Sequence, residues 1–164
     1  CNEPNGAVTW KKHIKPYAKT IIGTIRKYSK NAVIVVGTPT WSQDVDVVAQ
    51  SPLRSKNVMY ALHFYAATHK EWIQDKLKKA HKKGLPVMVT EFSICDASGN
   101  GALDKASARK WMKLLDKDNI SYTAWSLCNK NESSALIESS CNKTSGWTRS
   151  DLSPAGKWYF DQTK

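Results

Sequence analysis

The chain has 164 residues and a formal net charge of +11, and 41% of its residues are hydrophobic. This length suits one ordinary domain with a real core, and the composition excludes a disordered chain. No apolar run reaches the ~20 residues that cross a bilayer, so we expect no membrane partner. Lysines supply most of the charge, without an arginine-rich arm or zinc-finger spacing, so we expect no nucleic-acid partner.

The four cysteines are Cys1, Cys95, Cys128 and Cys141, and no two of them form a CxxC pair. Neither a metal site nor a thioredoxin-like motif is therefore indicated. Cys128 and Cys141 could bridge a loop, but four cysteines allow three pairings and the spacing does not choose. The chain opens with a cysteine instead of a methionine and a basic, apolar leader, so we expect that it begins after processing or within a longer protein.

Strand and helix patterns alternate along the chain. The first helix pattern has apolar residues at three- and four-residue spacing, which predicts one buried face: Ile14, Ala18, Ile21, Ile25 and Tyr28. Pro16 indicates a helix start or kink nearby. The β-branched residues 33–36, closed by Gly37, predict the first strand. Residues 58–64 predict the second strand because they are apolar on both faces.

A second helix is predicted from about residue 70 to residue 83, with Ile73, Leu77 and Ala80 inward and Gly84 as its stop. Residues 86–90 predict the third strand. A third helix is predicted from an Asp104 N-cap, with four inward positions: Ala108, Trp111, Met112 and Leu115. Residues 120–125 predict the fourth strand, and Ser153-Pro154 begins a last helix. This order predicts an α/β protein with parallel strands in one continuous unit.

Polar and aromatic residues follow every predicted strand. They are Thr38, Thr40 and Trp41 after the first strand, His63 and Tyr65 at the second, Glu91 at the third, and Trp125, Lys130 and Glu132 after the fourth. Ligands of such folds bind at the carboxyl ends of the strands. Glu91 is the sharpest candidate, because a carboxylate that closes an apolar strand is costly unless it is partnered or used. A structural ion pair is the alternative explanation.

Glu3 lies between Asn2 and Pro4, ahead of a helix that starts near Trp10, and so occupies the same kind of loop position as Glu91. Two carboxylates at one mouth are what glycoside hydrolysis requires. One protonates the leaving oxygen, and the other attacks the anomeric carbon or activates water. Tryptophans near the same strand ends offer flat faces for sugar rings.

Several motifs carry a resemblance to glycoside hydrolase family 5, above all to bacterial-type endo-β-1,4-glucanases (cellulases). These motifs are Asn2-Glu3-Pro4, His63-Phe64-Tyr65, Thr90-Glu91-Phe92, Trp125-Ser126-Leu127 and the stretch that follows from Lys130 to Ser134. The resemblance implies a retaining hydrolase with Glu3 as acid/base and Glu91 as nucleophile. It also implies the substrate-binding residues: Asn2 at the sugar 2-hydroxyl, His63 and Tyr65 beside the nucleophile, Trp125 under the sugar, Lys130 and Glu132 at neighbouring hydroxyls, and Trp41 on the leaving-group side.

The same resemblance implies a TIM-barrel fold of the (β/α)8 type. Residues 1–164 would be the C-terminal half of the catalytic domain, with equivalents of strands five to eight and the tip of strand four. We therefore expect a β-glucan substrate, no cofactor or metal, secretion, and closure of the half-barrel by a second copy or by a separate N-terminal half, since open sheet edges are a liability.

Three alternatives stay open at this stage. The chain could be a non-catalytic β-glucan-binding or structural half-barrel that keeps the aromatic rim without turnover. It could be a basic nucleic-acid binder, whose DNA binding would weaken steeply with salt. Within the family, mannan or xylan could replace glucan as the substrate.

Overall fold

A computed structural model describes residues 1–162 of the chain. They form two compact units that alternate along the sequence. Unit 1 comprises Cys1–His63 and Trp72–Thr90, and unit 2 comprises Phe64–Glu71 and Glu91–Lys164. Two strands, β2 (Val58–Tyr65) and β3 (Val87–Ser93), run on from unit 1 into unit 2. Each unit therefore contains part of the same two strands.

The strands follow the order β1-β2-β3-β4. In unit 1, β1 (Ile34–Val36) pairs in parallel with β2, with Ile34 opposite Val58. In unit 2, β4 (Tyr122–Ala124) adjoins β3, and the Trp125 N–H donates to the Phe92 carbonyl at 2.8 Å. The predicted α/β class with parallel strands is confirmed. The third strand extends beyond its predicted end, so Glu91 lies within β3 and not after it.

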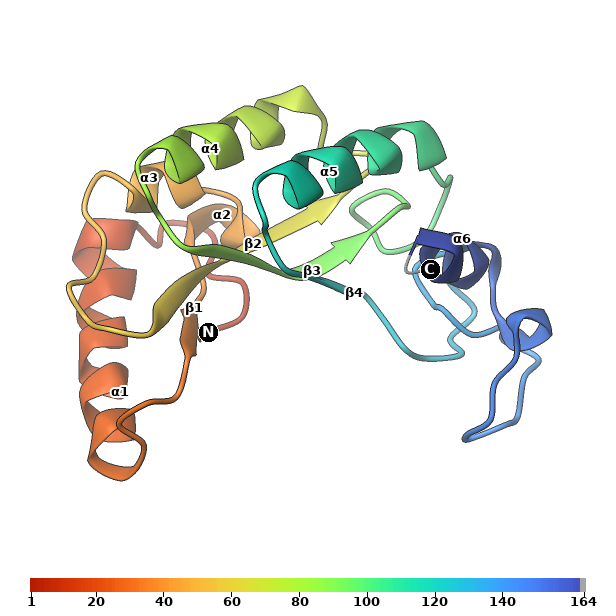
Figure 1. Cartoon of the computed structure of the whole chain (residues 1–164), viewed down its shortest axis with the longest axis horizontal. Helices are drawn as coiled ribbons and strands as arrows, with labels where there is room; N and C mark the ends of the chain where they lie inside the picture. The colour runs from red at the N-terminus through yellow and green to blue at the C-terminus, as the bar shows by residue number, and fades with distance from the viewer. Residues whose placement is uncertain (163–164) are drawn as a thin grey trace. The chain divides into compact units, whose positions relative to one another are not determined.

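Unit 1 has short and long helices beside its strands (Figure 1). They are η1 (Trp10–Ile14), α1 (Lys15–Tyr28), α2 (Pro39–Ser42), α3 (Val45–Val48) and α4 (Glu71–Lys82), of which Glu71 belongs to unit 2. Pro16 lies at the junction where η1 continues into α1, which agrees with the helix start or kink predicted near this proline. The inward residues predicted for α4 are all buried, and Gly84 has the positive φ of a helix stop.

The predicted buried face of α1 is partly wrong. Ile14, Ala18 and Ile22 are buried, whereas Ile21 is 40% exposed and Tyr28 is 88% exposed. The physical reason is the geometry of the element: Tyr28 is the last residue of α1, and Ile21 faces an open groove beside β1. The apolar stripe of α1 is therefore wider than its buried face.

Unit 2 contains α5 (Lys105–Lys117), η2 (Arg149–Asp151) and α6 (Pro154–Gln162). The Asp104 side chain accepts the Ser107 N–H at 2.8 Å, which confirms the predicted N-cap of α5. The core of this unit is aromatic. The Phe64 ring stacks on Trp111 at a centroid distance of 3.8 Å and on Phe92 at 5.2 Å. This stack joins α5 to the ends of both shared strands.

The cysteine pairing that the sequence left open is absent from the structure, in which Cys1, Cys95, Cys128 and Cys141 all carry unpaired thiols. Among the helices of residues 1–162, none has both the length and the apolar character of a membrane span.

Candidate active site

The Glu3 carboxylate of unit 1 is held by a histidine of β2. Glu3 lies in an irregular segment ahead of η1, and its Oε1 is 2.7 Å from Nδ1 of His63. The His63 side chain is 2% exposed, against 31% for Glu3. On the other side of the imidazole, Nε2 is 2.8 Å from Oγ1 of Thr90 on β3. Glu3 therefore keeps access to solvent, while a buried ring and a strand hydroxyl define its position.

This chain of three groups suits a carboxyl that must gain and lose a proton. When Glu3 is ionised, a neutral His63 can donate from Nδ1 and accept the Thr90 hydroxyl proton at Nε2. When Glu3 is protonated, it can donate to Nδ1, while Nε2–H donates to the hydroxyl of Thr90. Both states keep the hydrogen bonds of His63 to Glu3 and to Thr90 and need no charged histidine. The arrangement can therefore serve an acid/base residue in either state.

Backbone carbonyls on both sides of Glu3, those of Asn2 and Pro4, accept hydrogen bonds from Ser42 and Trp41 in unit 1. The Trp41 N–H donates to the carbonyl of Pro4 at 3.0 Å, and the Ser42 hydroxyl donates to the carbonyl of Asn2 at 2.7 Å. The Trp41 side chain is 49% exposed. An indole that presents this much surface can stack on a sugar ring.

The Glu91 carboxylate of unit 2 has a tyrosine partner. The residue is 7% exposed, and its Oε1 accepts the Tyr65 hydroxyl at 2.8 Å. His69, which follows β2, fixes Tyr65 in turn, because its Nδ1 accepts the Tyr65 backbone N–H at 2.8 Å. The His69 carbonyl accepts the indole N–H of Trp111 at 2.8 Å. The support for Glu91 thus extends through the loop after β2 to the core of unit 2.

Burial raises the pKa of the Cys95 thiol, and the negative charges of Asp96 and Glu132 raise it further. The thiol is therefore protonated near neutral pH and a poor nucleophile. Among the groups of unit 2 near the end of β3, the Glu91 carboxylate is the better candidate for attack on an electrophile.

The remaining predicted residues of unit 2 follow β4. Trp125 is 42% exposed, and Lys130 Nζ lies 3.8 Å from Glu132 Oε1. The Glu132 carboxylate also accepts the Ser134 hydroxyl at 3.2 Å. Lys130 and Glu132 line a polar hollow of about 350 Å³. A cation and a carboxylate side by side at such a hollow can bind two hydroxyls of one sugar.

The structure adds a contact to one predicted set. We expected His63 and Tyr65 to orient Glu91. The Tyr65 hydroxyl donates to the Glu91 carboxylate, and Nδ1 of His63 contacts Glu3. Sequence reasoning missed Thr90, Ser42 and His69 as supporting residues. The sequence offered a clue to Thr90, because this residue precedes Glu91 in the motif Thr90-Glu91-Phe92. It offered none for Ser42 and His69, whose contacts depend on tertiary structure.

Comparison with known proteins gives a consistent result. The sequence model of the family described as "Cellulase (glycosyl hydrolase family 5)" matches residues 1–131. An endoglucanase of Clostridium saccharobutylicum is 49% identical over 156 residues, which are 95% of this chain and 35% of that protein. A solved structure from Cytophaga hutchinsonii superposes with a TM-score of 0.95 at 42% identity, over 98% of this chain and 53% of that one.

The catalytic domain of an endoglucanase from Thermobifida fusca, solved in complex with cellotetraose, is also similar. Its TM-score is 0.90 at 34% identity, over 98% of this chain and 54% of that one. The chain therefore spans about a third of the length of the curated relative and about half of each solved chain.

Proposed function

Because the chain belongs to glycosyl hydrolase family 5, the cellulase family, we propose that it carries the two catalytic carboxylates of a retaining endo-β-1,4-glucanase. Glu3 is the acid/base and Glu91 is the nucleophile. The observation that carries the proposal is that each carboxylate has its own hydrogen-bonding partner, the buried His63 for Glu3 and the half-buried Tyr65 for Glu91.

The proposed reaction has two steps. The Glu91 carboxylate attacks the anomeric carbon and forms a glycosyl ester, while the glycosidic C–O bond breaks and Glu3 gives its proton to the leaving oxygen. In the second step Glu3 takes a proton from water, whose oxygen replaces Glu91 on the anomeric carbon. Two inversions at one carbon restore its configuration. The chemistry calls on no metal or cofactor.

The contacts of each residue support its role. The Tyr65 O–H donates to the carboxylate of Glu91 and holds one of its oxygens in place. Glu3 is more exposed than Glu91, so its proton can pass to a leaving group or come from water. Trp125 would stack under the sugar at the cleavage site, Lys130 and Glu132 would bind neighbouring hydroxyls, and Trp41 would lie on the leaving-group side.

The substrate that we propose is a β-1,4-glucan, because the matched relatives are named endoglucanases and one solved relative holds cellotetraose. Cellulose is an insoluble polymer that cells do not take up, so we also propose that the protein acts outside the cell. Asn2 would bind the sugar 2-hydroxyl, a group whose configuration differs between glucose and mannose. That contact would favour glucan over mannan.

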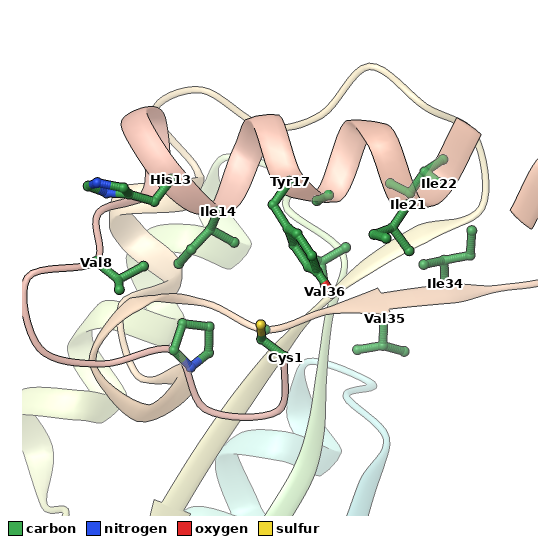
Figure 2. A pocket seen from close by; sticks show the side chains of 13 residues that line it. Cys1, Val8, His13, Ile14, Tyr17, Ile21, Ile22, Ile34, Val35 and Val36 are labelled. Atoms are coloured by element: carbon green, nitrogen blue, oxygen red, sulfur yellow. The ribbon is translucent and has the colours of Figure 1, made fainter. Parts of the chain in front are cut away.

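We also propose that the chain works with a complementary polypeptide, and an apolar groove of unit 1 supports this proposal (Figure 2). The groove has a volume of about 290 Å³ and lies between α1 and β1, where Tyr17, Ile21 and Val35 leave apolar surface exposed. Within residues 1–162, β1 is also an end strand that pairs with β2 alone. Open sheet edges and large apolar patches are normally covered.

The occupant that we propose is the polypeptide equivalent to the part of the solved relatives that this chain does not span. Two solved relatives are matched over only 53% and 50% of their length, which leaves a partner of similar size to this chain. Its strand would pair with the outer edge of β1, and an apolar helix face would cover Tyr17 and Ile21. A second copy of this chain is the alternative occupant.

The test combines solution mass with an activity assay on one sample. Light scattering is measured for the chain alone and after co-expression with the remaining N-terminal part of a family 5 catalytic domain. We expect the 1:1 complex to release reducing ends from soluble cellulose derivatives and to form the β-anomer first, as observed by proton NMR. Initial formation of the α-anomer would overturn retention.

Two other outcomes would support the alternatives. A complex that binds glucan without cleaving it would support the non-catalytic alternative. Cleavage by a dimer of this chain would identify the second copy as the occupant.

A further inference from the structure

Three consecutive residues of unit 1 have an unusual backbone. Thr40, Trp41 and Ser42 have φ angles of 55°, 53° and 57°, in the left-handed region. None of them is glycine. For residues that have a Cβ atom this region of φ is sterically unfavourable, so three such residues in a row are unusual. Such conformations persist only where surrounding contacts impose them, and they are concentrated at functional sites. The segment 40–42, called the left-handed turn below, therefore calls for an explanation.

The contacts of the left-handed turn provide one. The Trp41 N–H donates to the carbonyl of Pro4 at 3.0 Å, and the Ser42 hydroxyl donates to the carbonyl of Asn2 at 2.7 Å. These two carbonyls belong to the residues immediately before and after Glu3. The left-handed turn thus holds the backbone of Glu3 from both sides.

The left-handed turn is itself firmly anchored within unit 1. Ser42 is fully buried, and its hydroxyl accepts the Thr38 N–H at 3.3 Å while it donates to Asn2. The Thr38 hydroxyl donates to the Ala61 carbonyl of β2 at 3.1 Å. Thr40 donates to the carboxylate of Asp44 at 2.6 Å. The same carboxylate pairs at 2.5 Å with a lysine of α4, Lys76. The anchors thus connect the left-handed turn to a strand and a long helix.

The backbone at Gly37 lies so close to the backbone of Cys1 and Asn2 that the segment carrying Glu3 has little room to move. A Cβ atom built on Gly37 would lie 2.5 Å from the Cys1 carbonyl oxygen and 3.1 Å from that of Asn2. Any side chain at position 37 would therefore displace the segment that carries Glu3. Gly37 at the end of β1 thus allows close contact with residues 1–2, and the left-handed turn hydrogen-bonds to Asn2 and Pro4.

We propose that the left-handed turn is a positioning device for the acid/base, with Ser42 as its principal positioning residue. The proposal rests on the acid/base role proposed for Glu3. The same turn presents the exposed indole of Trp41, so a sugar stacked on that ring would contact the structure that places the proton donor. Recognition of the leaving group and delivery of its proton would then share one rigid support.

The decisive variant is Ser42→Ala, which removes the hydroxyl that bridges Asn2 and Thr38. Ser42→Gly is its companion, because glycine adopts a positive φ without strain and so removes the hydroxyl while keeping the turn accessible. The matched control is Ser153→Ala in unit 2. The Ser153 hydroxyl also bridges a carbonyl and an amide, since it donates to Ala135 at 2.5 Å and accepts the Gly156 N–H at 3.0 Å.

The first readout is independent of catalysis. In the full chain labelled with 15N-histidine, the four histidines give separate ring signals, and a His63→Gln sample assigns those of His63. We expect both Ser42 variants to shift the ring 15N signals of His63, because Glu3 moves relative to Nδ1, and Ser153→Ala to leave them unchanged. Unshifted His63 signals in a folded Ser42→Gly sample would overturn the proposal.

The second readout is activity in the presence of the complementary polypeptide. A misplaced acid should slow substrates with poor leaving groups, so we expect Ser42→Gly to lose about tenfold more activity on unactivated cello-oligosaccharides than on aryl glycosides with good leaving groups. Equal losses on both substrates would overturn the proposal. Absence of cleavage by the unmodified complex would instead refute the proposed function, and the histidine signals would still decide whether Ser42 places Glu3.

Discussion

The carboxylates of the two units are held in different ways. Glu91 lies inside β3 and is nearly buried, so strand pairing fixes its backbone and Tyr65 needs to fix only its side chain. Glu3 lies in an irregular segment, where no ladder fixes the backbone. The left-handed turn supplies the missing backbone contacts, and His63 supplies the side-chain contact.

This difference shows what regular structure contributes to a functional group. The backbone of a residue within a strand is fixed by the hydrogen bonds that pair the strands. A residue in an irregular segment depends instead on specific contacts from distant parts of the chain. The Glu3 side of the site should therefore be the more sensitive to substitutions outside the carboxylates themselves.

The largest effect should come from Glu91→Gln. The amide keeps the shape of the side chain but cannot attack the anomeric carbon, so we expect cleavage by the complemented protein to fall on the order of 10⁴-fold or more. Binding of cello-oligosaccharides, measured by calorimetry, should stay nearly unchanged. Turnover close to that of the unmodified complex would remove Glu91 from the nucleophile role.

Glu3→Ala should have a smaller effect that depends on the substrate. General acid catalysis contributes about 10²–10⁴-fold, so we expect a loss of that size on unactivated glucans. Aryl glycosides whose leaving groups need little protonation should still form the glycosyl ester, which mass spectrometry of the quenched protein would detect. If both substrate classes lose the same activity, the acid/base assignment is wrong.

Trp111→Ala tests the contacts of Trp111 with Phe64 and His69 in the core of unit 2. The change removes the stack on Phe64 and the hydrogen bond to the His69 carbonyl, so we expect a loss of about 3–5 kcal/mol in the free energy of unfolding of the chain. Urea denaturation with and without the substitution measures it. Trp111→Phe is the control, because it keeps an aromatic ring at this position and should lose less. Equal losses for the two variants would show that the stack contributes little.

Asp104→Ala tests a peripheral contact of unit 2. Loss of the cap at the start of α5 should lower the free energy of unfolding by about 1 kcal/mol at neutral pH. A hydrogen bond from Lys70, together with the cap bond from Ser107, holds the pKa of Asp104 below its ordinary value. The stabilisation is therefore present above the unfolded-state pKa of about 3.9 and is lost as the pH falls through the lower folded-state pKa.

The difference in stability between Asp104→Ala and the unmodified chain should accordingly shrink on acidification below about pH 4. Thermal unfolding followed by circular dichroism across that range measures this difference. A difference that is independent of pH would show that the cap does not depend on the ionised form.

The smallest effect should come from Asp151 in the loop before α6. Hydrogen bonds from Lys143 and Thr148 hold its pKa well below the ordinary value. The sign is the same as for Asp104: the contribution is present above the unfolded-state pKa and lost as the pH falls. We expect Lys143→Met to lower the melting temperature by about one degree at pH 7 and by less in acid, because this ion pair is at the surface. A large change at pH 7 would mean that the loop stabilises unit 2 as a whole.

Much of the fold was predictable from local patterns. The four strands and the long helices α1, α4 and α5 follow from apolar periodicity, and the Asp104 cap follows from its position ahead of α5. The short helices α2 and α3 between β1 and β2 were not predicted. The candidate site residues were inferred from strand ends and from the family motifs, and their roles stay predictions. The exposure of Ile21 and Tyr28 was not, because periodicity shows which residues share a helix face but not which part of that face another element covers.

The sequence by itself determined the order of strands and helices, the positions of Glu3 and Glu91 near strand ends, and the family. These properties depend on neighbours a few residues apart, whose side chains impose strand or helix directly. Only the tertiary structure decided that His63 engages Glu3 and that Thr40, Trp41 and Ser42 adopt a left-handed conformation. Local preference disfavours that conformation for all three residues, and it persists because hydrogen bonds to carbonyls almost forty residues away in the sequence, at Asn2 and Pro4, hold the turn in place.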